Sequence, residues 1–196
     1  MTDQTGQTDQ IYLVCGYKRT GKDTLVKMFN TRSEFKWLIY SNSLSNNLVI
    51  RNVTRVAFAD KLREEVNKSL NIIEEFDYDT FKEIVVQDGK TYRDILIEHA
   101  AYRRNQDPDY WVKQINIVGE SMITDWRYPN ELLYLSKHCK AITIRLFRSE
   151  VPIPPSDVIS EHQLDNTVTD FLLVPNEEDF EKACKIFPQY QNYHIC

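Results

Sequence analysis

The chain has 196 residues, of which 42% are hydrophobic, and it carries a net charge of −5 at pH 7. This length and composition are typical of one domain with a buried core and a small inserted subdomain. The negative charge argues against general electrostatic binding to nucleic acid, and no apolar run approaches the ~20 residues of a membrane-spanning helix.

The first structural signal follows a polar stretch, residues 1–10, which has no apolar signal core and which we expect to be a disordered tail. Residues 11–15 form an apolar run of strand length, and residues 25–29 continue as a helix would. Between them, two glycines separated by four residues precede a lysine, which is the spacing of a phosphate-binding loop. The segment reads Gly16-Tyr17-Lys18-Arg19-Thr20-Gly21-Lys22-Asp23-Thr24.

The physics of such a loop explains its spacing. Gly16 and Gly21 allow backbone conformations closed to other residues, so that amide N–H groups can turn inward around phosphate oxygens. A helix that begins near Lys22 directs its positive end at the same oxygens, and the lysine would reach the β- and γ-phosphates. The alternative is an ordinary glycine-rich turn with a solvated lysine. We expect the phosphates of a nucleotide to be bound by Gly16, Lys18, Arg19, Thr20, Gly21, Lys22, Asp23 and Thr24.

The metal position departs from the usual pattern, because Asp23 stands where a serine or threonine normally supplies a hydroxyl to Mg²⁺. Either Asp23 binds the metal through water, or Thr24 replaces the usual hydroxyl. Asp125 ends a predicted strand, as an acidic magnesium partner of a phosphate loop should. The segment 125–131 gathers a carboxylate, a guanidinium and an amide there. Its alternative interpretation is a turn with a helix cap and a surface arginine.

Strands and helices alternate along the rest of the chain. We expect strands at 53–59, 121–124, 141–147 and 171–174, and a short strand candidate at 37–40. Helices are expected over 60–70, 77–88, 91–104, 107–118, 129–137 and 176–187, with Asp60, Thr91, Asp107 and Asn176 as caps. Trp111, Ile115 and Val118 would form the buried stripe of the fourth. This pattern predicts a P-loop NTPase-type three-layer α/β/α fold with a mostly parallel five-stranded sheet.

Arginines on one predicted helix are candidates for binding a second phosphate. Arg93 and Arg104 are eleven residues apart, about three turns, and so share a face, with Arg103 adjacent. A monophosphate needs a fork of donors, which arginine supplies better than lysine. The alternative is that these are ordinary exposed arginines of a helix.

The segment 148–160 holds three prolines and no periodicity, which predicts a loop. Arg145 and Arg148 flank it, and one of them could neutralise charge on a transferred phosphoryl group. We favour Arg148, because it lies where the strand gives way to the loop. His162 follows the loop, and a histidine in such a place is more often structural than catalytic.

In their order, these motifs resemble the phage- and virus-type deoxynucleoside monophosphate kinases. The 16–24 segment is similar to that family's loop, including the aspartate after the lysine. The other matching segments are Phe58-Ala59-Asp60-Lys61-Leu62, Thr91-Tyr92-Arg93, Asp109-Tyr110-Trp111-Val112, Ile123-Thr124-Asp125-Trp126-Arg127-Tyr128-Pro129-Asn130-Glu131, and Ser160-Glu161 with Leu164-Asp165. The resemblance covers about residues 11–187.

This resemblance implies transfer of the γ-phosphate of ATP to a deoxynucleoside 5′-monophosphate, with Mg²⁺. It implies a kinase domain over 11–187, acceptor-binding helices at about 60–118, a lid at 148–160 and a carboxyl-terminal tail at 188–196. The implied partners are small-molecule substrates, without nucleic acid or membrane, and a homodimer is left open. The implied location is the cytoplasm, that of the host if the chain is viral. The scattered cysteines, which lack metal spacing, agree with free thiols in a reducing compartment.

The resemblance also implies roles on the donor side. Lys22 and the loop amides would hold the donor phosphates, and Asn176, past the last strand, would lie near the adenine. The implied catalytic residues are Lys22, Asp125, Arg127 and Arg148, the last of them in the lid. The implied metal ligands are Asp23, Thr24 and Asp125.

On the acceptor side, Arg93 would grip the acceptor phosphate with the assistance of Arg103 or Arg104. Asp125 and Arg127 would lie between donor and acceptor. The implied acceptor-binding residues are Asp60, Arg93, Arg103, Arg104, Trp126 and Arg127.

Three alternatives stay open. The same landmarks resemble animal-type phosphomevalonate kinase, a relative on the same fold, although the Asp-Tyr-Trp and Arg-Tyr-Pro-Asn-Glu wording favours the nucleotide kinases. A GTPase-like switch would need an Asn-Lys-x-Asp motif, which this chain lacks. A non-catalytic nucleotide-binding protein is the third, and Asp23 at the metal position gives it some weight.

Overall fold

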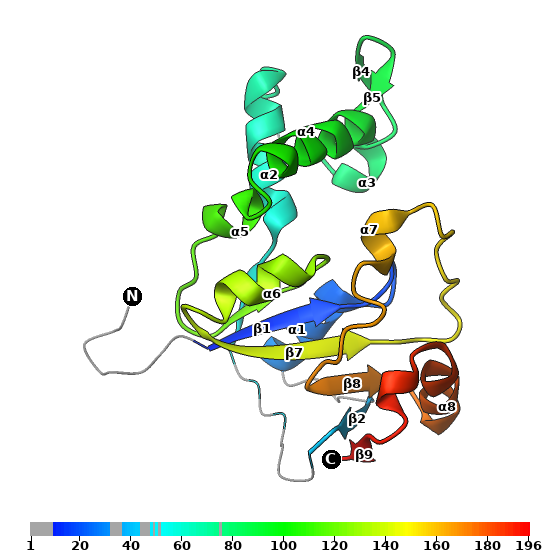
Figure 1. The fold of residues 1–196 in the computed structure, drawn as a ribbon. Helices are drawn as coiled ribbons and strands as arrows, with labels where there is room; N and C mark the ends of the chain where they lie inside the picture. Colours follow the sequence, from blue (N-terminus) through cyan, green and yellow to red (C-terminus); the bar gives the residue numbers. More distant parts are fainter. Residues whose placement is uncertain (1–9, 32–36, 44–47, 49, 51, 75) are drawn as a thin grey trace, which may run out of the picture. The chain divides into compact units, whose positions relative to one another are not determined.

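A computed structural model describes residues 10–31, 37–43, 48, 50, 52–74 and 76–196 (Figure 1). The chain divides into two compact units, the first built from Met1–Val56 with Ile117–Cys196 and the second from Ala57–Asn116. The bounds of the second unit are close to the 60–118 range expected for the inserted helices. Residues 1–9 of the expected tail lie outside the described residues, whereas Gln10 begins the first strand.

The first unit contains a mostly parallel sheet in the order β3-β6-β1-β7-β8-β2-β9. Its five parallel strands are β3 (Thr54–Val56), β6 (Ser121–Ile123), β1 (Gln10–Cys15), β7 (Lys140–Leu146) and β8 (Phe171–Val174). Strand β1 pairs with β6 on one side and on the other with β7, beside which it runs in Figure 1. Residues 11–15 of β1 are buried. This burial explains the continuous apolar run, since a strand in the middle of a parallel sheet is covered on both faces.

The expected five-stranded sheet is wrong in its strand number, because the described residues form a seven-stranded sheet. Strand β2 (Leu38–Ser41) pairs antiparallel with β8, and β9 (His194–Ile195) pairs antiparallel with β2. The short strand candidate at 37–40 therefore exists, but as an antiparallel addition. Strand β9 has two residues, too few to show a period in the sequence.

Helices cover both faces of this sheet. Helix α1 (Lys22–Thr31) contributes Leu25 and Val26 to the cluster that holds Phe171 and Leu173 of β8. Helix α8 (Glu177–Ile186) contributes Ala183 to a second cluster with Leu172 and Val174, which point the other way from the same strand. Because successive strand residues face opposite sides, the two clusters lie on opposite faces of the sheet. The layering is compatible with the three-layer α/β/α expectation.

The remaining helices of the first unit are short. They are α6 (Pro129–Leu135), α7 (Ile159–His162) and the 3-10 helix η1 (Pro188–Tyr190). Pro129 begins α6 and Asn176 caps α8 by accepting a hydrogen bond from the Asp179 amide, as predicted. The loop predicted at 148–160 ends earlier, at residue 158, where α7 follows.

The last nine residues are not the tail that was expected at 188–196. Tyr190 and Tyr193 are buried and their rings meet edge to face at 4.8 Å between centroids. Together with β9 they complete the α8 side of the sheet. This packing has no periodic signature, since it depends on isolated aromatic residues.

The second unit is mostly helical. It contains α2 (Phe58–Ser69), α3 (Tyr78–Phe81), a hairpin of β4 (Val85–Gln87) and β5 (Lys90–Thr91), α4 (Tyr92–Gln106) and α5 (Tyr110–Gln114). Val66, Tyr92 and Leu96 form its buried centre. The predicted cap of α4 is confirmed, because Thr91 and Asp94 form a reciprocal capping box.

Three expectations for this unit are wrong. Asp60 is not a cap but lies in the first turn of α2, whose N-cap is Ala57. The helix expected at 77–88 is the single turn α3 followed by the hairpin. The helix expected from Asp107 to 118 is α5 alone, and Val118 of its supposed buried stripe is 66% exposed. Within the described residues, no helix is both long and apolar enough to cross a membrane.

Candidate functional site

The loop between β1 and α1, residues 16–21, has a backbone that depends on glycine. Gly16 has φ +141° and Gly21 has φ +96°. A Cβ atom on Gly16 would lie 2.5 Å from the Leu146 carbonyl oxygen, a distance that real Cβ atoms do not tolerate. Thr20 is buried and donates from Oγ1 to the Tyr17 carbonyl oxygen at 2.9 Å, which closes the loop. The loop therefore requires glycine at position 16 for steric as well as conformational reasons.

Lys22, the first residue of α1, folds back across this loop. Its Nζ donates to the carbonyl oxygens of Gly16 at 2.6 Å and Tyr17 at 2.8 Å. Burial lowers the pKa of the ammonium group, and the neighbouring Arg127 guanidinium lowers it further. A primary ammonium has three donors, so two of them hold the side chain in place. The lysine is thus positioned by its own loop.

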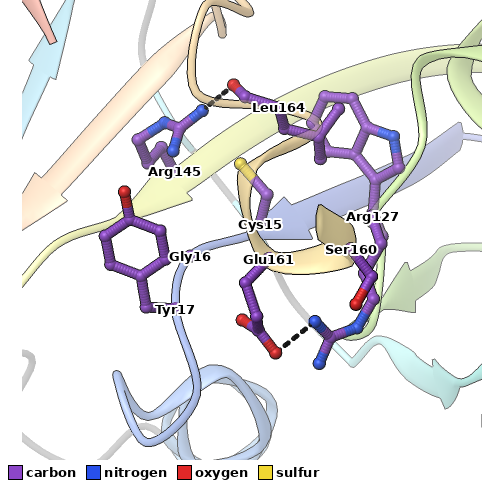
Figure 2. Close-up of a pocket in the computed structure, with 9 residues that line it drawn as sticks. Cys15, Gly16, Tyr17, Arg127, Arg145, Ser160, Glu161 and Leu164 are labelled. Atoms are coloured by element: carbon purple, nitrogen blue, oxygen red, sulfur yellow. Dashed lines mark hydrogen bonds and ion pairs between the residues drawn. The ribbon is translucent and has the colours of Figure 1, made fainter. Parts of the chain in front are cut away.

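Arg127 lies in the segment between β6 and α6 and pairs with Glu161 of α7 (Figure 2). The Arg127 backbone N–H also donates to Oε2 of Glu131 at 3.0 Å, and the Tyr128 N–H does so at the same distance. Glu131 is buried. Its carboxylate therefore fixes the start of α6 and the backbone from which the Arg127 side chain projects.

A small, partly open pocket lies beside this ion pair (Figure 2). Cys15 and Gly16 line it at the end of β1, Arg127 and Glu161 form one charged part of its wall, and Arg145 of β7 forms another. The other lining residues are Tyr17, Trp126, Ser160 and Leu164. Its position at the carboxyl end of a parallel strand matches where ligands bind in α/β sheets.

Asp23 lies in the first turn of α1 and is engaged by two donors. Its Oδ1 accepts a hydrogen bond from Arg55 Nε at 2.8 Å and from Thr124 Oγ1 at 2.9 Å. Partial burial opposes ionisation, but these hydrogen bonds outweigh it and lower the pKa of the carboxyl. Asp125 follows Thr124 directly. The oxygen donors expected to hold magnesium are therefore carried by the first turn of α1 (Asp23 and Thr24) and by the segment after β6 (Asp125), which the Thr124–Asp23 hydrogen bond joins.

Arg145 and Arg148 have different surroundings. Arg145 is 2% exposed, donates to the Tyr190 hydroxyl at 2.7 Å and to the Leu164 carbonyl, and stacks on Phe187 at 4.5 Å. Arg148 is partly exposed, pairs with Glu150, and has a buried Nε without a hydrogen-bond partner among the described residues. Arg145 is therefore committed to the core, and Arg148 is the more exposed of the two arginines that flank the loop.

Two further residues expected in the site have structural partners. Trp126 is 2% exposed and donates from Nε1 to the Tyr128 carbonyl oxygen at 2.9 Å, although it also lines the pocket. Asn176 caps α8, and its amide also donates to Asp179 Oδ2 at 3.3 Å. Lys18, Arg19 and Thr24 are exposed around the loop, and Arg19 has φ +72°.

The arginines of the second unit are not equivalent. Arg103 donates from Nε to Glu65 Oε2 at 3.0 Å and stacks on the Tyr110 ring at 4.8 Å, so it holds α2, α4 and α5 together. Arg93 begins α4 and reaches Glu83 only at 3.7 Å. Asp60 pairs with Arg63 on α2. Arg104 lies on the same helix as Arg93, eleven residues on.

Sequence reasoning assigned no role to Glu161 and Glu131, the two carboxylates around Arg127. Both glutamates lie in segments that resemble the nucleotide kinases, Glu161 in Ser160-Glu161 and Glu131 in the 123–131 segment. That resemblance was the signal in the sequence that could have pointed to them. Ion pairs between residues 34 apart in the chain cannot be inferred from periodicity. Within the described residues, no three His, Cys, Asp or Glu side chains gather as a metal centre would require.

Comparison with known proteins assigns no family to this chain. Neither a protein-family model nor a curated protein matches it. The function must therefore be argued from the residues and their contacts.

Proposed function

We propose that this protein is an ATP-dependent nucleoside monophosphate kinase that phosphorylates a deoxynucleoside 5′-monophosphate. The observation that carries the proposal is the position of Lys22. Its Nζ is held by the Gly16 and Tyr17 carbonyl oxygens at the carboxyl end of β1, and the Arg127 guanidinium is near enough to lower its pKa. Two cations beside a glycine-dependent loop are suited to the β- and γ-phosphates of a nucleoside triphosphate.

Each residue around the loop has a part in the proposed reaction. The loop amides and the remaining N–H donor of Lys22 bind donor phosphate oxygens. Arg127, oriented by Glu161 and by the Glu131-capped backbone, neutralises charge on the transferred group. Arg148, at the start of the 148–158 loop, adds a third positive charge when that loop covers the nucleotide. The adenine base packs against the start of α8, where Asn176 is the cap.

Magnesium fits the proposed donor set, because Asp23, Thr24 and Asp125 offer the hard oxygen ligands that Mg²⁺ prefers. Few protein ligands are needed, since Mg²⁺ in kinases is also held by phosphate oxygens and water. When bound, the ion neutralises the phosphate charge. Arg55 and Thr124 occupy Oδ1 of Asp23, which favours a water-bridged contact for Asp23 and leaves Thr24 and Asp125 as the other ligands.

The acceptor phosphate is assigned to Arg93, with Arg103 or Arg104 of the same helix as the assisting residue. The Arg103 guanidinium also binds Glu65, so its part in acceptor binding would add to a structural one. Asp60 and Trp126 complete the proposed acceptor side. Asp60 has a structural partner in Arg63, and Trp126 is almost fully buried.

A non-catalytic nucleotide-binding protein is the second candidate, and one observation favours it. The Asp23 carboxylate, at the position of the usual metal-binding hydroxyl, is taken up by Arg55 and Thr124. Such a protein would bind ATP without transferring its phosphate.

An acceptor screen tests the proposal. The full chain is incubated with Mg·ATP and each of the ribo- and deoxynucleoside monophosphates in turn, with phosphomevalonate as a separate arm, and diphosphate formation is measured by chromatography. The proposal expects diphosphate from at least one deoxynucleoside monophosphate. Turnover with phosphomevalonate alone would reassign the acceptor, and ATP binding without transfer to any acceptor would support the second candidate.

A further inference from the structure

His162 is surrounded by hydrogen-bond acceptors. It ends helix α7, directly after the 148–158 loop, and its side chain is 24% exposed. Its Nδ1 lies 2.7 Å from Asp165 Oδ2. Its Nε2 lies 3.1 Å from the Pro154 carbonyl oxygen and 3.2 Å from that of Pro155. The ring therefore joins the proline turn of the loop to the segment that follows α7.

These partners determine the protonation of the ring. A peptide carbonyl oxygen can only accept a hydrogen bond, so Nε2 must carry a proton. A carboxylate also only accepts, so Nδ1 must carry one as well. A neutral imidazole has a single N–H, so it can donate either to Asp165 or to the proline carbonyl oxygens but not to both. The geometry is thus that of an imidazolium ion.

Groups from two other parts of the chain face this contact. Tyr17, in the loop after β1, donates its O–H to Asp165 Oδ2 at 3.1 Å, and its ring meets the His162 ring edge to face at 5.7 Å. Arg145 of β7 lies 4.0 Å from Asp165 Oδ1. Oδ2 of Asp165 is thus engaged by both Tyr17 and His162, whereas its buried Oδ1 has no hydrogen-bond partner among the described residues and lies near the Arg145 guanidinium. The Asp165 hydrogen bond raises the pKa of His162, partial burial opposes this, and the Pro154 carbonyl adds to the rise.

Helix α7 connects this contact to the candidate site. Glu161 precedes His162 on the same single-turn helix and pairs with Arg127. A helix of one turn has almost no stability of its own, so it depends on side chains that tie its ends. His162 provides such a tie at the carboxyl end of α7, and it simultaneously holds the loop that leads into the helix.

We propose that His162 is a positioning residue: as an imidazolium it ties the Pro154–Pro155 turn of the 148–158 loop to Asp165 and so fixes α7, from which Glu161 orients Arg127. The link to catalysis rests on the proposed kinase function, whereas the tie itself does not. Loss of one proton removes one of the two donors. The 148–158 loop then separates from α7, or α7 from Asp165, and the Glu161 carboxylate loses its fixed place beside Arg127.

Nitrogen-15 NMR of the histidine rings in the full chain tests the tie without reference to activity. His162→Gln assigns the His162 signals, and the exposed residues His138 and His194 serve as internal references. We expect both His162 nitrogens to be protonated at pH 7, with a titration midpoint above those of the two references. Asp165→Asn should lower that midpoint by about one pH unit. A singly protonated His162 ring at pH 7, with a midpoint like that of His194, would overturn the proposal.

Hydrogen exchange of the 148–158 loop, corrected for intrinsic rates, tests the positioning. In the wild type, protection should fall as pH rises through the His162 midpoint, and His194→Gln should behave identically. His162→Gln should show no such step. If His162→Gln keeps the step, His162 does not hold the loop. If His162→Gln fails to fold, the pH-dependent fall in protection of the 148–158 loop is measured in Asp165→Asn instead. In that variant the fall must occur at the lower pH that matches the lowered His162 midpoint.

Turnover separates this proposal from the proposed function. With an acceptor that is phosphorylated, the wild-type kcat should decline as pH rises through the titration midpoint of His162, while the KM for ATP changes little. The kcat of His162→Gln should not show this decline. If the wild-type enzyme is active but its kcat shows no such decline, the His162 contacts do not affect catalysis. If no acceptor is phosphorylated, the kinase function fails, while the NMR and exchange results still decide on the tie.

Discussion

Thr124, at the end of β6, donates a hydrogen bond from Oγ1 to Asp23 Oδ1 in the first turn of α1 at 2.9 Å. The two residues are 101 positions apart in the chain. Arg55 Nε binds the same oxygen at 2.8 Å. The contact fastens the start of α1, and with it Lys22, to the neighbouring strands. Asp23 is therefore a structural clamp of the candidate site, whatever its part in metal binding.

Thr124→Val should remove this clamp at nearly constant shape. We expect the free energy of unfolding to fall by about 1–2 kcal/mol, because a hydrogen bond to a charged group is lost. Urea denaturation measures the change, and Thr54→Val, at an exposed strand position, serves as the matched control. A loss no larger than that of the control would show that the contact contributes nothing.

The same variant has a pH dependence. The folded-state pKa of Asp23 is lowered, so its contribution is present above the unfolded value of about 3.9 and disappears as pH falls through the folded value. The stability difference between wild type and Thr124→Val should accordingly be constant near neutral pH and shrink below about pH 4. Urea titrations between neutral and acid pH measure it.

Gly16→Ala should damage the 16–21 loop. The new Cβ would meet the Leu146 carbonyl oxygen at 2.5 Å and Thr20 Oγ1 at 2.9 Å, in addition to the strain of a positive φ. We expect a loss of about 2–3 kcal/mol in unfolding free energy. Gly119→Ala separates the two effects, because φ is +61° there but nothing lies within 4 Å, and should cost only about 1 kcal/mol. Equal losses of unfolding free energy in the two variants would show that the contact with the Leu146 carbonyl oxygen does not add to the cost at Gly16.

Several elements of both units could be predicted from the sequence, because their signals are local. The run at 11–15 is buried on both faces, Phe171–Val174 matches its predicted range, and the caps Thr91 and Asn176 lie where a side chain and an amide three residues apart can meet. In each case the determinant lies within a few residues. Local signals therefore predicted the parallel strands and the starts of α4 and α8.

The wrong predictions have identifiable causes. The helix expected at 77–88 overlooked Asp88-Gly89, a dipeptide typical of two-residue hairpins, which adopts φ +49° and +75° between β4 and β5. The terminal residues were expected to form a tail because the contacts that bury Tyr190 and Tyr193, such as those with Arg145 and Thr169, come from distant parts of the chain and leave no local pattern. The Arg127–Glu161 and Arg145–Tyr190 pairs depend on the tertiary fold, and no sequence spacing reports them.

Arg145→Leu should destabilise the protein far more than Arg148→Leu. Arg145 is buried, and its removal leaves the Tyr190 hydroxyl, the Leu164 carbonyl and Asp165 without their cationic partner. We expect a loss of about 3–5 kcal/mol for Arg145→Leu and about 0.5 kcal/mol for Arg148→Leu. Thermal unfolding measures both. If Arg148→Leu were the more damaging change, the lid assignment of Arg148 would have to be abandoned.

Within the second unit, replacing Arg103 should lower the stability more than replacing Arg93. Arg103→Ala breaks the Glu65 and Tyr110 contacts and should lower stability by about 1–2 kcal/mol. Arg93→Ala loses the 3.7 Å approach to Glu83, an exposed ion pair, and should change stability by about 0.5 kcal/mol or less. In the proposed kinase it should instead raise the acceptor KM about tenfold or more. An unchanged acceptor KM in Arg93→Ala would exclude Arg93 from the acceptor site.

The affinity for Mg·ATP, measured by isothermal titration calorimetry of the wild type, Lys22→Ala and the exposed-lysine control Lys27→Ala, tests the central claim most directly. Lys22 is held by its loop at the end of β1, so its loss should weaken ATP binding about tenfold or more, whereas Lys27→Ala should bind like the wild type. Wild-type ATP affinity in Lys22→Ala would contradict the assignment of this loop to the donor phosphates.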